Sequence, residues 1–367
     1  MTTTVPRRPA GEVGGSPRGA ASPAAPSATS AAEAPAPRTA PPDPASGDAA
    51  AAASLGVTVS DATLRRFLHG LPGVDHVGLE ARVARLASRS LVGTAEREAL
   101  DLAVSLVDLT TLEGPDTADR VRGLCAAARR PDPGDPSCPP VAAVCVYGDL
   151  VEVAAAALAG SGVKVAAVAG AFPSGRAPLE VRLADVGAAV AAGADEVDVV
   201  IDRGAFLAGR YLDVHDEIAA SRQACGRCRL KVILETGELG SDDDVRRAAW
   251  LAMLAGADLV KTSTGKVSPA ATPTAALVLA QAVRDFRAET GRMVGVKVAG
   301  GIRTARDALR YLVLVHETCG NDWLTPDSFR LGASSLLDDL VARRRAVAGD
   351  GDGDGDGDTS ARRPATP

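Results

Sequence analysis

Short runs of valine, isoleucine and leucine recur through the middle of the chain, and each is followed by an alanine- and arginine-rich segment with helical spacing. Runs that are apolar throughout are typical of strands buried on both faces of a parallel sheet. Eight strand–helix units within about 240 residues favour a closed (β/α)8 TIM barrel over an open doubly wound sheet. The expected strands are residues 105–112, 141–147, 163–172, 196–201, 230–236, 258–264, 294–300 and 329–335.

The first part of the 367-residue chain has a composition of its own. Residues 1–54 consist largely of Ala, Pro, Ser, Thr and Gly, with almost no large apolar side chain to offset the entropy of ordering, so we expect a disordered extension. Its scattered arginines also loosely resemble a transit peptide, although the stretch lacks a convincing amphipathic helix. We predict the barrel domain over residues 55–347, in which the apolar segment 57–91 supplies a helical cap across the lower mouth.

The last part of the chain, residues 348–367, is expected to be a disordered Gly/Asp tail. Its run GDGDGDGD, residues 351–358, resembles a calcium-binding turn, but it lacks apolar residues that would stack a repeat, so a solvated acidic tail is the simpler interpretation.

Cys225 and Cys228 have redox or zinc spacing. Because no second such pair and no nearby histidine completes a site, we interpret them as reduced surface cysteines between a helix and a strand, and expect no metal and no cofactor.

Composition narrows the class of partner. A formal net charge of -6 argues against a nucleic-acid-binding protein, which would normally carry a basic stripe. No apolar run reaches the roughly 18 residues of a membrane span, and no secretory signal opens the chain, so we expect no membrane partner and a cytoplasmic location. A small-molecule partner is the remaining expectation.

Active sites of such barrels lie at the carboxyl ends of the strands, so polar residues late in the predicted strands are the candidates for chemistry. They come from all but the third strand. These residues are Asp108 and Thr110 on the first strand, Cys145 on the second, Asp198 on the fourth, Glu235 on the fifth, Lys261, Thr262 and Ser263 on the sixth, Lys297 on the seventh, and Ser334 and Ser335 on the eighth.

Two lysines among these candidates, Lys261 and Lys297, lie on neighbouring strands and would share one apolar space. Burial and a like charge both disfavour the ammonium form, so at least one should have a lowered pKa and a nucleophilic neutral amine, as imine chemistry requires. A single lysine could instead reach solvent or pair with Asp198 or Glu235. Two on adjacent strands favour catalysis. Lys231 stands early in its strand, so we assign it to structure or to a carboxylate partner, away from the catalytic face.

Three glycine-containing loops predict a phosphate site. GGIRT (300–304) and GASS (332–335) follow the last two strands, where barrels often bind phosphate with backbone N–H groups and a helix N-terminus. In the third loop, after the sixth strand, Gly265 and Lys266 could add another backbone N–H and a cation. Glycine also permits tight turns without any ligand, but three loops converging on one quadrant favour phosphate. We predict substrate or phosphate contacts from Asp108, Thr110, Cys145, Thr262, Gly265, Lys266, Gly300, Gly301, Arg303, Gly332, Ser334 and Ser335.

Five stretches of the sequence carry a resemblance to a known family. ADEVDVVID, LKVILETGEL, AGADLVKTSTGKV, GVKVAGGIRTARDALRYL and RLGASSLL closely resemble deoxyribose-phosphate aldolases, which are class I aldolases. VDLTTL and FPSG are similar to the family's first and third strand ends, and the resemblance runs from about Val107 to Leu340 in the family's order. Some bacterial members end in a tyrosine that assists proton exchange, whereas the last tyrosine here is Tyr311.

The resemblance implies an activity and three catalytic roles. The implied reaction is reversible cleavage of 2-deoxy-D-ribose 5-phosphate to D-glyceraldehyde 3-phosphate and acetaldehyde, in deoxyribose phosphate catabolism and without a metal. Lys261 would form the Schiff base, Lys297 would lower the pKa of Lys261, and Asp198 would transfer protons through a bound water. Homodimers are common for this fold and for the family, but one sequence gives no interface.

Two other classes of protein stay open. One is a different Schiff-base barrel, such as a transaldolase or a sugar-bisphosphate aldolase, in which the same lysine serves a longer substrate. The other is a non-catalytic barrel that binds a sugar phosphate. The presence of Lys261, Lys297 and Asp198 argues against the second, because a binding module has little use for a lysine of lowered pKa.

Overall fold

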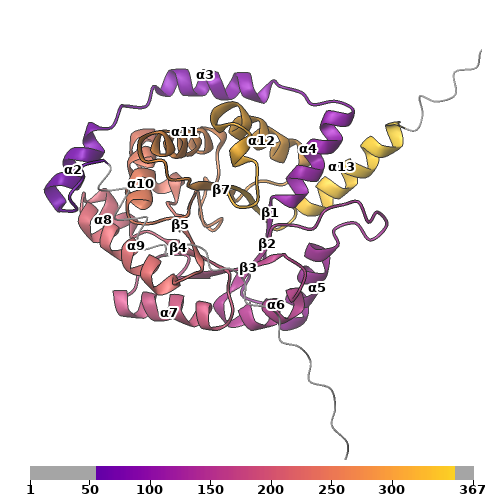
Figure 1. The fold of residues 1–367 in the computed structure, drawn as a ribbon, viewed down its shortest axis with the longest axis horizontal. Coiled ribbons are helices and arrows are strands. Elements are labelled where there is room, and N and C mark those ends of the chain that lie inside the picture. The colour runs from indigo at the N-terminus through magenta and orange to yellow at the C-terminus, as the bar shows by residue number, and fades with distance from the viewer. Residues whose placement is uncertain (1–54, 352–367) are drawn as a thin grey trace, which may run out of the picture. The chain divides into compact units, whose positions relative to one another are not determined.

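Eight parallel strands form one closed barrel in which each strand pairs with the next and the last pairs with the first (Figure 1). The computed structural model describes residues 55–351, so the predicted extension over residues 1–54 lies outside the described residues. Each predicted run contains a strand, and the predicted fold class is confirmed. The strands are β1 (Val107–Thr110), β2 (Ala143–Tyr147), β3 (Lys164–Ala169), β4 (Glu196–Val200), β5 (Arg229–Ile233), β6 (Leu259–Lys261), β7 (Gly295–Ala299) and β8 (Phe329–Ala333).

Helices alternate with the strands and surround the barrel (Figure 1). Several begin with a side-chain cap, since Thr304 and Asp307 form a capping box on α12 and Thr272 caps α11 ahead of Pro273. The helices are α2 (Asp61–Gly70), α3 (His76–Ala87), α4 (Thr94–Ser105), α5 (Ala118–Arg129), α6 (Val151–Leu158), α7 (Leu179–Ala191), α8 (Arg203–Leu207), α9 (Tyr211–Cys225), α10 (Asp242–Leu254), α11 (Pro273–Thr290), α12 (Ala305–Cys319) and α13 (Leu336–Gly351), with short 3-10 turns at Gly148–Leu150, Thr236–Glu238 and Asn321–Trp323.

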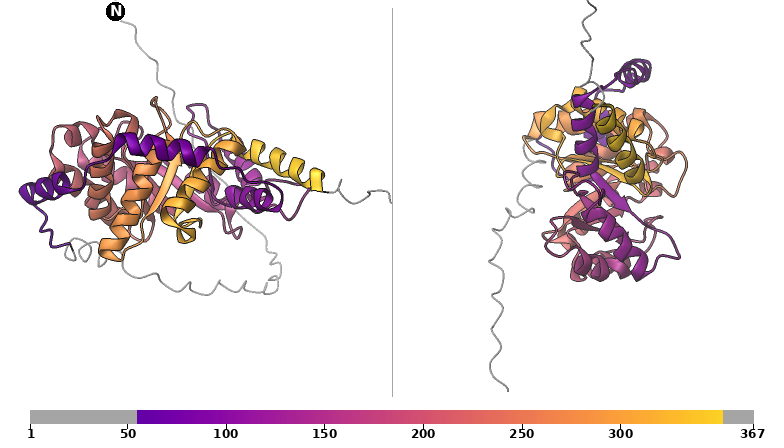
Figure 2. Two further views of the ribbon diagram at one scale, coloured as in Figure 1. Left: turned by 90° about the horizontal axis from the view of Figure 1, so that it is seen from above. Right: turned by 90° about the vertical axis from the view of Figure 1, so that its right-hand side faces the viewer.

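The two helices of the predicted segment 57–91, α2 and α3, do not lie where the sequence predicted, and α4 follows them on the outside of the barrel. α2 contacts α9 and α10, α3 contacts α11 and α12, and α4 contacts α12 and α13, so they cover the outer helical layer (Figures 1 and 2). The physical reason is that Leu64, Leu68, Leu79 and Leu86 are buried in the core shared with those helices. The predicted helices therefore form, but the prediction that they cap the lower mouth is wrong.

The last helix, α13, also extends further than predicted. It continues to Gly351, so the predicted start of the tail at residue 348 is wrong by a few residues, and the rest of the acidic run lies outside the described residues. Arg344 anchors the helix, since its side chain is buried and donates to Asp101 and Asp135. Arg345 donates to Asp132 at 2.7 Å.

The cysteines and the helix lengths bear on two further expectations. All six cysteines are free thiols. Cys228 lies between α9 and β5 as predicted, but Cys225 is the last residue of α9 and is buried, so the prediction that both lie at the surface is wrong. Cys228 Sγ donates to the Ala194 carbonyl at 2.9 Å, which is a structural contact. Among residues 55–351, no helix combines the length and the apolar character needed to cross a bilayer.

Candidate active site

A buried carboxylate, that of Asp198 on β4, lies at the centre of a lysine cluster inside the barrel. Its Oδ1 accepts from Lys231 Nζ at 2.8 Å, and its Oδ2 accepts from Lys261 Nζ at 2.7 Å and from Lys297 Nζ at 2.9 Å. None of these side chains is more than 3% exposed. The structure thus brings together the three residues predicted as catalytic and adds Lys231 to them.

The pairing of the strands explains why these side chains meet. Lys261 and Lys297 lie side by side in the register of β6 and β7, and Asp198 lies beside Lys231 in that of β4 and β5. Strands in a closed barrel are tilted and staggered, so residues at different points along two strands can reach the same level. Lys231 is a carboxylate partner as predicted, but the prediction that it stands away from the catalytic residues is wrong, because it shares Asp198 with Lys261.

Two further carboxylates and an arginine extend the cluster. Asp108 on β1 accepts from Lys297 Nζ at 2.6 Å. Glu196 on β4 lies 2.5 Å from Lys231 Nζ and 2.7 Å from Arg330 Nη2. Four basic side chains therefore face three carboxylates in a buried space. Because a guanidinium keeps its proton, an excess of positive charge is relieved most easily by a neutral lysine.

The surroundings shift the pKa values of the lysines in opposite directions, as an excess of positive charge predicts. Burial lowers the pKa of Lys261, and the ammonium of Lys297 lowers it further against the opposing effect of Asp198. Burial also disfavours the charged form of Lys297, but Asp108 and Asp198 outweigh it and raise the pKa of Lys297. The pKa of Lys231 is raised likewise, by Asp198 and Glu196 against burial. At least one lysine was expected to have a lowered pKa, and the surroundings of Lys261 act in that direction.

An apolar group of side chains lies beside the lysine cluster. Leu112, Cys145, Ala166 and Val168 are buried against one another, and Tyr147 and Phe172 pack on them. We call this group the apolar wall. Burial raises the pKa of the Cys145 thiol to about 11, so the thiol is neutral and behaves as an apolar group. Val168 on β3 lies beside Asp198 in the strand register, so the apolar wall begins next to the lysine cluster.

Most residues predicted to contact phosphate lie in loops after β6, β7 and β8. Gly265, Gly300 and Gly301 have φ values of +79°, +86° and +82°, which favour glycine. A Cβ on Gly300 would lie 3.1 Å from Gly265 Cα, so the loops after β6 and β7 touch through their backbones. The other four residues are exposed or half-buried and lie in the same three loops, namely Lys266, which pairs with Glu113 at 2.9 Å, Arg303, Ser334 and Ser335.

Three of the predicted contact residues make internal contacts instead. Thr110 Oγ1 donates to the Asp108 carbonyl at 2.9 Å, and Thr262 Oγ1 accepts from the Ala299 N–H at 3.0 Å. Gly332 lies within β8, where a Cβ would be 2.9 Å from Lys297 Cε. We therefore assign Gly332 to making room for Lys297 rather than to a phosphate loop.

Replacing Gly332 by alanine is expected to displace Lys297 from its carboxylates, because the added methyl would overlap Lys297 Cε. Overpacking of this kind costs about 1–3 kcal/mol of stability. We expect kcat/KM for aldol cleavage to fall roughly tenfold or more, since a small displacement of a positioned group lowers turnover. The control is Gly187→Ala within α7, where the methyl enters open space. Denaturant unfolding and kinetics on both variants check this, and wild-type kcat/KM in Gly332→Ala would contradict it.

Sequence reasoning missed Glu196 and Arg330. A signal for both was available, because side chains two residues apart in a strand point to the same face. Glu196 is two residues before Asp198, and Arg330 is two residues before Gly332, so both had to point into the barrel. The contact between Glu196 on β4 and Arg330 on β8 depends on closure of the barrel.

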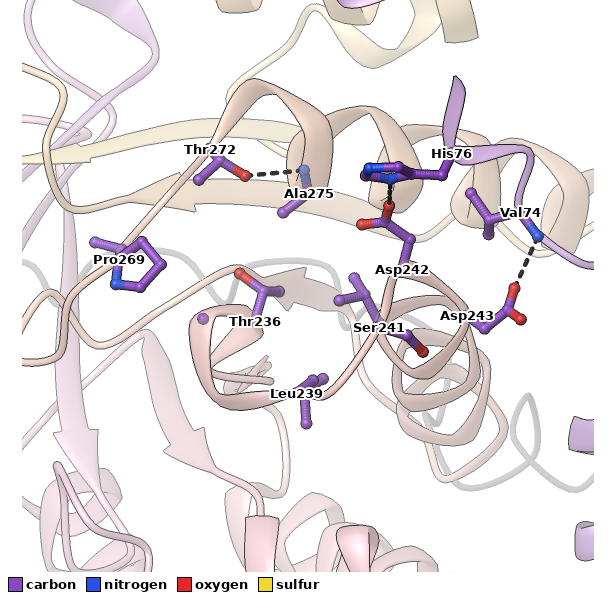
Figure 3. A pocket seen from close by; sticks show the side chains of 13 residues that line it. Val74, His76, Thr236, Leu239, Ser241, Asp242, Asp243, Pro269, Thr272 and Ala275 are labelled. Atoms are coloured by element: carbon purple, nitrogen blue, oxygen red, sulfur yellow. Dashed lines mark hydrogen bonds and ion pairs between the residues drawn. The ribbon is translucent and has the colours of Figure 1, made fainter. Parts of the chain in front are cut away.

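A separate cavity of about 460 Å³ lies between the segment before α3, the loop after β5 and the start of α11 (Figure 3). His76 Nδ1 lies 2.7 Å from Asp242 Oδ2, and the Val74 N–H donates to Asp243 Oδ1 at 2.7 Å. Thr236 and Pro269 form its inner side. The lysine cluster does not line it, but Ala270, which does, lies against Gly300 in the loop after β7.

Comparison with known proteins agrees with this geometry. The family described as DeoC/LacD family aldolase matches residues 102–340. Deoxyribose-phosphate aldolase of Mus musculus is 45% identical over 278 residues, which cover 73% of this chain and 87% of the relative. The Homo sapiens enzyme of that name is 44% identical over 282 residues with the same coverage. A tetrameric deoxyribose phosphate aldolase of Aeropyrum pernix is 26% identical, with a TM-score of 0.54 over 68% of this chain and 97% of that one.

The matched segment begins within α4 and ends within α13, so it includes every strand of the barrel. It also includes each residue of the lysine cluster and all three candidate phosphate loops. From the agreement of this match with the two mammalian relatives, we conclude that the chain belongs to the DeoC/LacD family of aldolases.

Proposed function

We propose that the chain is a class I aldolase that reversibly cleaves 2-deoxy-D-ribose 5-phosphate to D-glyceraldehyde 3-phosphate and acetaldehyde, a step of deoxyribose phosphate catabolism. The observation that carries this proposal is the buried amine of Lys261, whose pKa is lowered beside two lysines whose pKa values are raised. A neutral amine is the form that attacks an aldehyde carbon. The names of the mammalian relatives supply the substrate.

In the proposed mechanism, Lys261 Nζ attacks C1 of the open-chain sugar phosphate, and loss of water leaves a protonated imine. The electrons of the C2–C3 bond then move toward the iminium nitrogen to give an enamine, while the C3 hydroxyl loses its proton and C3 becomes the aldehyde of glyceraldehyde 3-phosphate. Protonation of the enamine at C2 and hydrolysis release acetaldehyde. The iminium accepts the electrons, so no step calls on a metal ion.

Two neighbours of Lys261 are assigned supporting roles. Asp198 Oδ2 lies 2.7 Å from Lys261 Nζ, close enough to pass protons to and from the reacting atoms directly or through one water. Lys297 lies 2.9 Å from the same oxygen and keeps the carboxylate ionised. Its ammonium also favours the neutral form of Lys261. The two residues thus prepare the nucleophile and the proton path together.

The phosphate of the substrate is assigned to the loops after β6, β7 and β8. Gly265 and Gly301 would present backbone N–H groups, and Ser334 and Ser335 would do so at the start of α13. Lys266 and Arg303 add positive charge, which would require Lys266 to exchange Glu113 for phosphate. Binding energy from this remote group can be used to orient C1 toward Lys261.

An assay for acetaldehyde tests the reaction class. Purified protein with 2-deoxy-D-ribose 5-phosphate is expected to release acetaldehyde, detected as NADH oxidation by added alcohol dehydrogenase, at a rate within the usual 1–10³ s⁻¹. A transaldolase or a sugar-bisphosphate aldolase would release no acetaldehyde from this substrate but would still form a reducible lysine adduct with its own. A non-catalytic barrel would bind the sugar phosphate and form no adduct.

Two finer expectations from the sequence are also proposals. We propose a cytoplasmic location, which fractionation of the native cells would test. We also propose a homodimer, the state common for this fold. Because the Aeropyrum pernix relative is described as tetrameric, light scattering must distinguish two copies from four.

A further inference from the structure

Glu235, two residues after the end of β5, carries a carboxylate that the proposed aldolase chemistry does not use. Its side chain is fully buried. Its backbone φ of +53° is a left-handed conformation, which is uncommon and costly for a residue with a Cβ. Thr264 Oγ1 donates to Glu235 Oε2 at 2.5 Å, and the Thr264 N–H lies 3.3 Å from both carboxylate oxygens. A buried carboxylate on a left-handed backbone thus accepts from both the hydroxyl and the N–H of Thr264.

That contact holds the loop after β6. The Thr264 hydroxyl gives its proton to Glu235 and accepts one from the Lys266 N–H at 3.1 Å. Between them lies Gly265, whose left-handed backbone abuts Gly300 in the loop after β7. A chain of hydrogen bonds from Glu235 therefore fixes two candidate phosphate residues, Gly265 and Lys266, where their loop meets the next one.

A second partner anchors the carboxylate from its other side. Arg203 at the start of α8 lies 3.4 Å from Glu235 and 3.1 Å from Glu238, and it donates to the Ser174 carbonyl at 3.0 Å. The groups within hydrogen-bond distance of the Glu235 carboxylate are all donors, namely the Thr264 hydroxyl and N–H and the Arg203 guanidinium. Only an ionised carboxylate accepts from all of them, since an amide would turn an NH2 group toward a donor.

We propose that Glu235 is a positioning residue for phosphate recognition, which sets the affinity for the phosphorylated substrate by fixing the loop that carries Gly265 and Lys266. This rests on the proposed function, since it requires a phosphate at that loop. The contacts of Glu235 run to Thr264 and Arg203, whereas the amine of Lys261 is bound to Asp198. The effect of Glu235 is therefore on binding of the phosphate end and not on the chemistry at Lys261.

The test is Glu235→Gln, which replaces one accepting oxygen by a donor. The lost hydrogen bond has a charged acceptor, so we expect KM for 2-deoxy-D-ribose 5-phosphate to rise about tenfold or more. A loss of uniform binding leaves kcat nearly unchanged, so kcat should stay within about threefold. For unphosphorylated 2-deoxy-D-ribose, kcat/KM should also stay within about threefold.

Matched variants keep the test decisive. Glu238→Gln removes the other carboxylate on Arg203 and should keep wild-type KM. If Glu235→Gln does not fold, Thr264→Val and Thr264→Ser carry the comparison, since only valine lacks the hydroxyl and only it should raise KM. Equal losses on both sugars, or unchanged KM in Glu235→Gln and Thr264→Val, would overturn the proposal. Calorimetric affinity for D-glyceraldehyde 3-phosphate, expected to weaken about tenfold in Glu235→Gln, decides it even if the wild-type protein releases no acetaldehyde and the aldolase assignment fails.

Discussion

Replacing Lys261 by alanine is expected to lower kcat for cleavage of 2-deoxy-D-ribose 5-phosphate by at least about 10⁴-fold, because the covalent route is lost entirely. Neither lysine beside it can take over, since carboxylates raise the pKa values of both Lys231 and Lys297. The fold should survive. Without Lys261, three cations face three carboxylates, so we expect a melting temperature close to that of the wild-type protein.

Borohydride reduction in the presence of acetaldehyde, followed by peptide mapping, measures this directly. The chain has only five lysines, so the position of a two-carbon adduct is easily assigned among Lys164, Lys231, Lys261, Lys266 and Lys297. We expect the adduct on Lys261 and its absence from Lys261→Ala. Lys164→Ala, at the amino end of β3, is the control and should keep both adduct and turnover. An adduct on Lys297, or appreciable turnover in Lys261→Ala, would contradict the assignment.

Replacing Lys297 by methionine is expected to lower kcat/KM near pH 7 by about 10²–10³-fold and to move the acid limb of the pH profile upward. The ammonium of Lys297 lowers the pKa of Lys261, and Lys297 also shares the charge of Asp198. Without it, Asp198 acts more strongly on Lys261, so the pKa of Lys261 rises and the amine stays protonated to higher pH. Raising the pH should then restore part of the activity.

The pH dependence of kcat/KM distinguishes the Lys297→Met variant from the Lys261→Ala variant, which lacks the nucleophile. Lys261→Ala should show no recovery at any pH, whereas Lys297→Met should recover as the pH rises through the raised pKa of Lys261. Lys164→Met removes the same charge at the far end of a strand and should leave the limb in place. An acid limb that stays at its wild-type position in Lys297→Met would show that Lys297 does not control the protonation of Lys261.

The strands and the meeting of Lys261, Lys297 and Asp198 were predictable from the sequence for one physical reason. Parallel strands covered on both faces need continuous apolar runs, so each polar residue near the end of such a run marks the edge of the sheet. Closure of the barrel then gathers those ends around one axis. Lys261 stood out because the run ending in it is otherwise apolar.

The rest depended on contacts that no single segment encodes. The partnership of Glu196 with Arg330 joins β4 to β8 across the barrel, and the contact of Lys231 with Asp198 depends on the register in which β4 and β5 pair. The left-handed backbone of Glu235 has no local signal, since a glutamate rarely adopts it. The apolar stripes of α2 and α3 predicted burial, but not which helices would bury them.

The apolar wall has a consequence for which donor aldehydes the site can use. A methyl or methylene carbon attached to the imine can lie against Ala166 and Val168 without losing any partner. A hydroxyl on that carbon would give up its hydrogen bonds to water and find no replacement among Leu112, Cys145, Ala166 and Val168, at a cost of about 1–3 kcal/mol. Selection against hydroxylated donors would thus come from the cost of removing water from the hydroxyl rather than from its size. The substitution Ala166→Ser would supply a hydrogen-bond partner there, and would be the first change to make for a broader range of donor aldehydes.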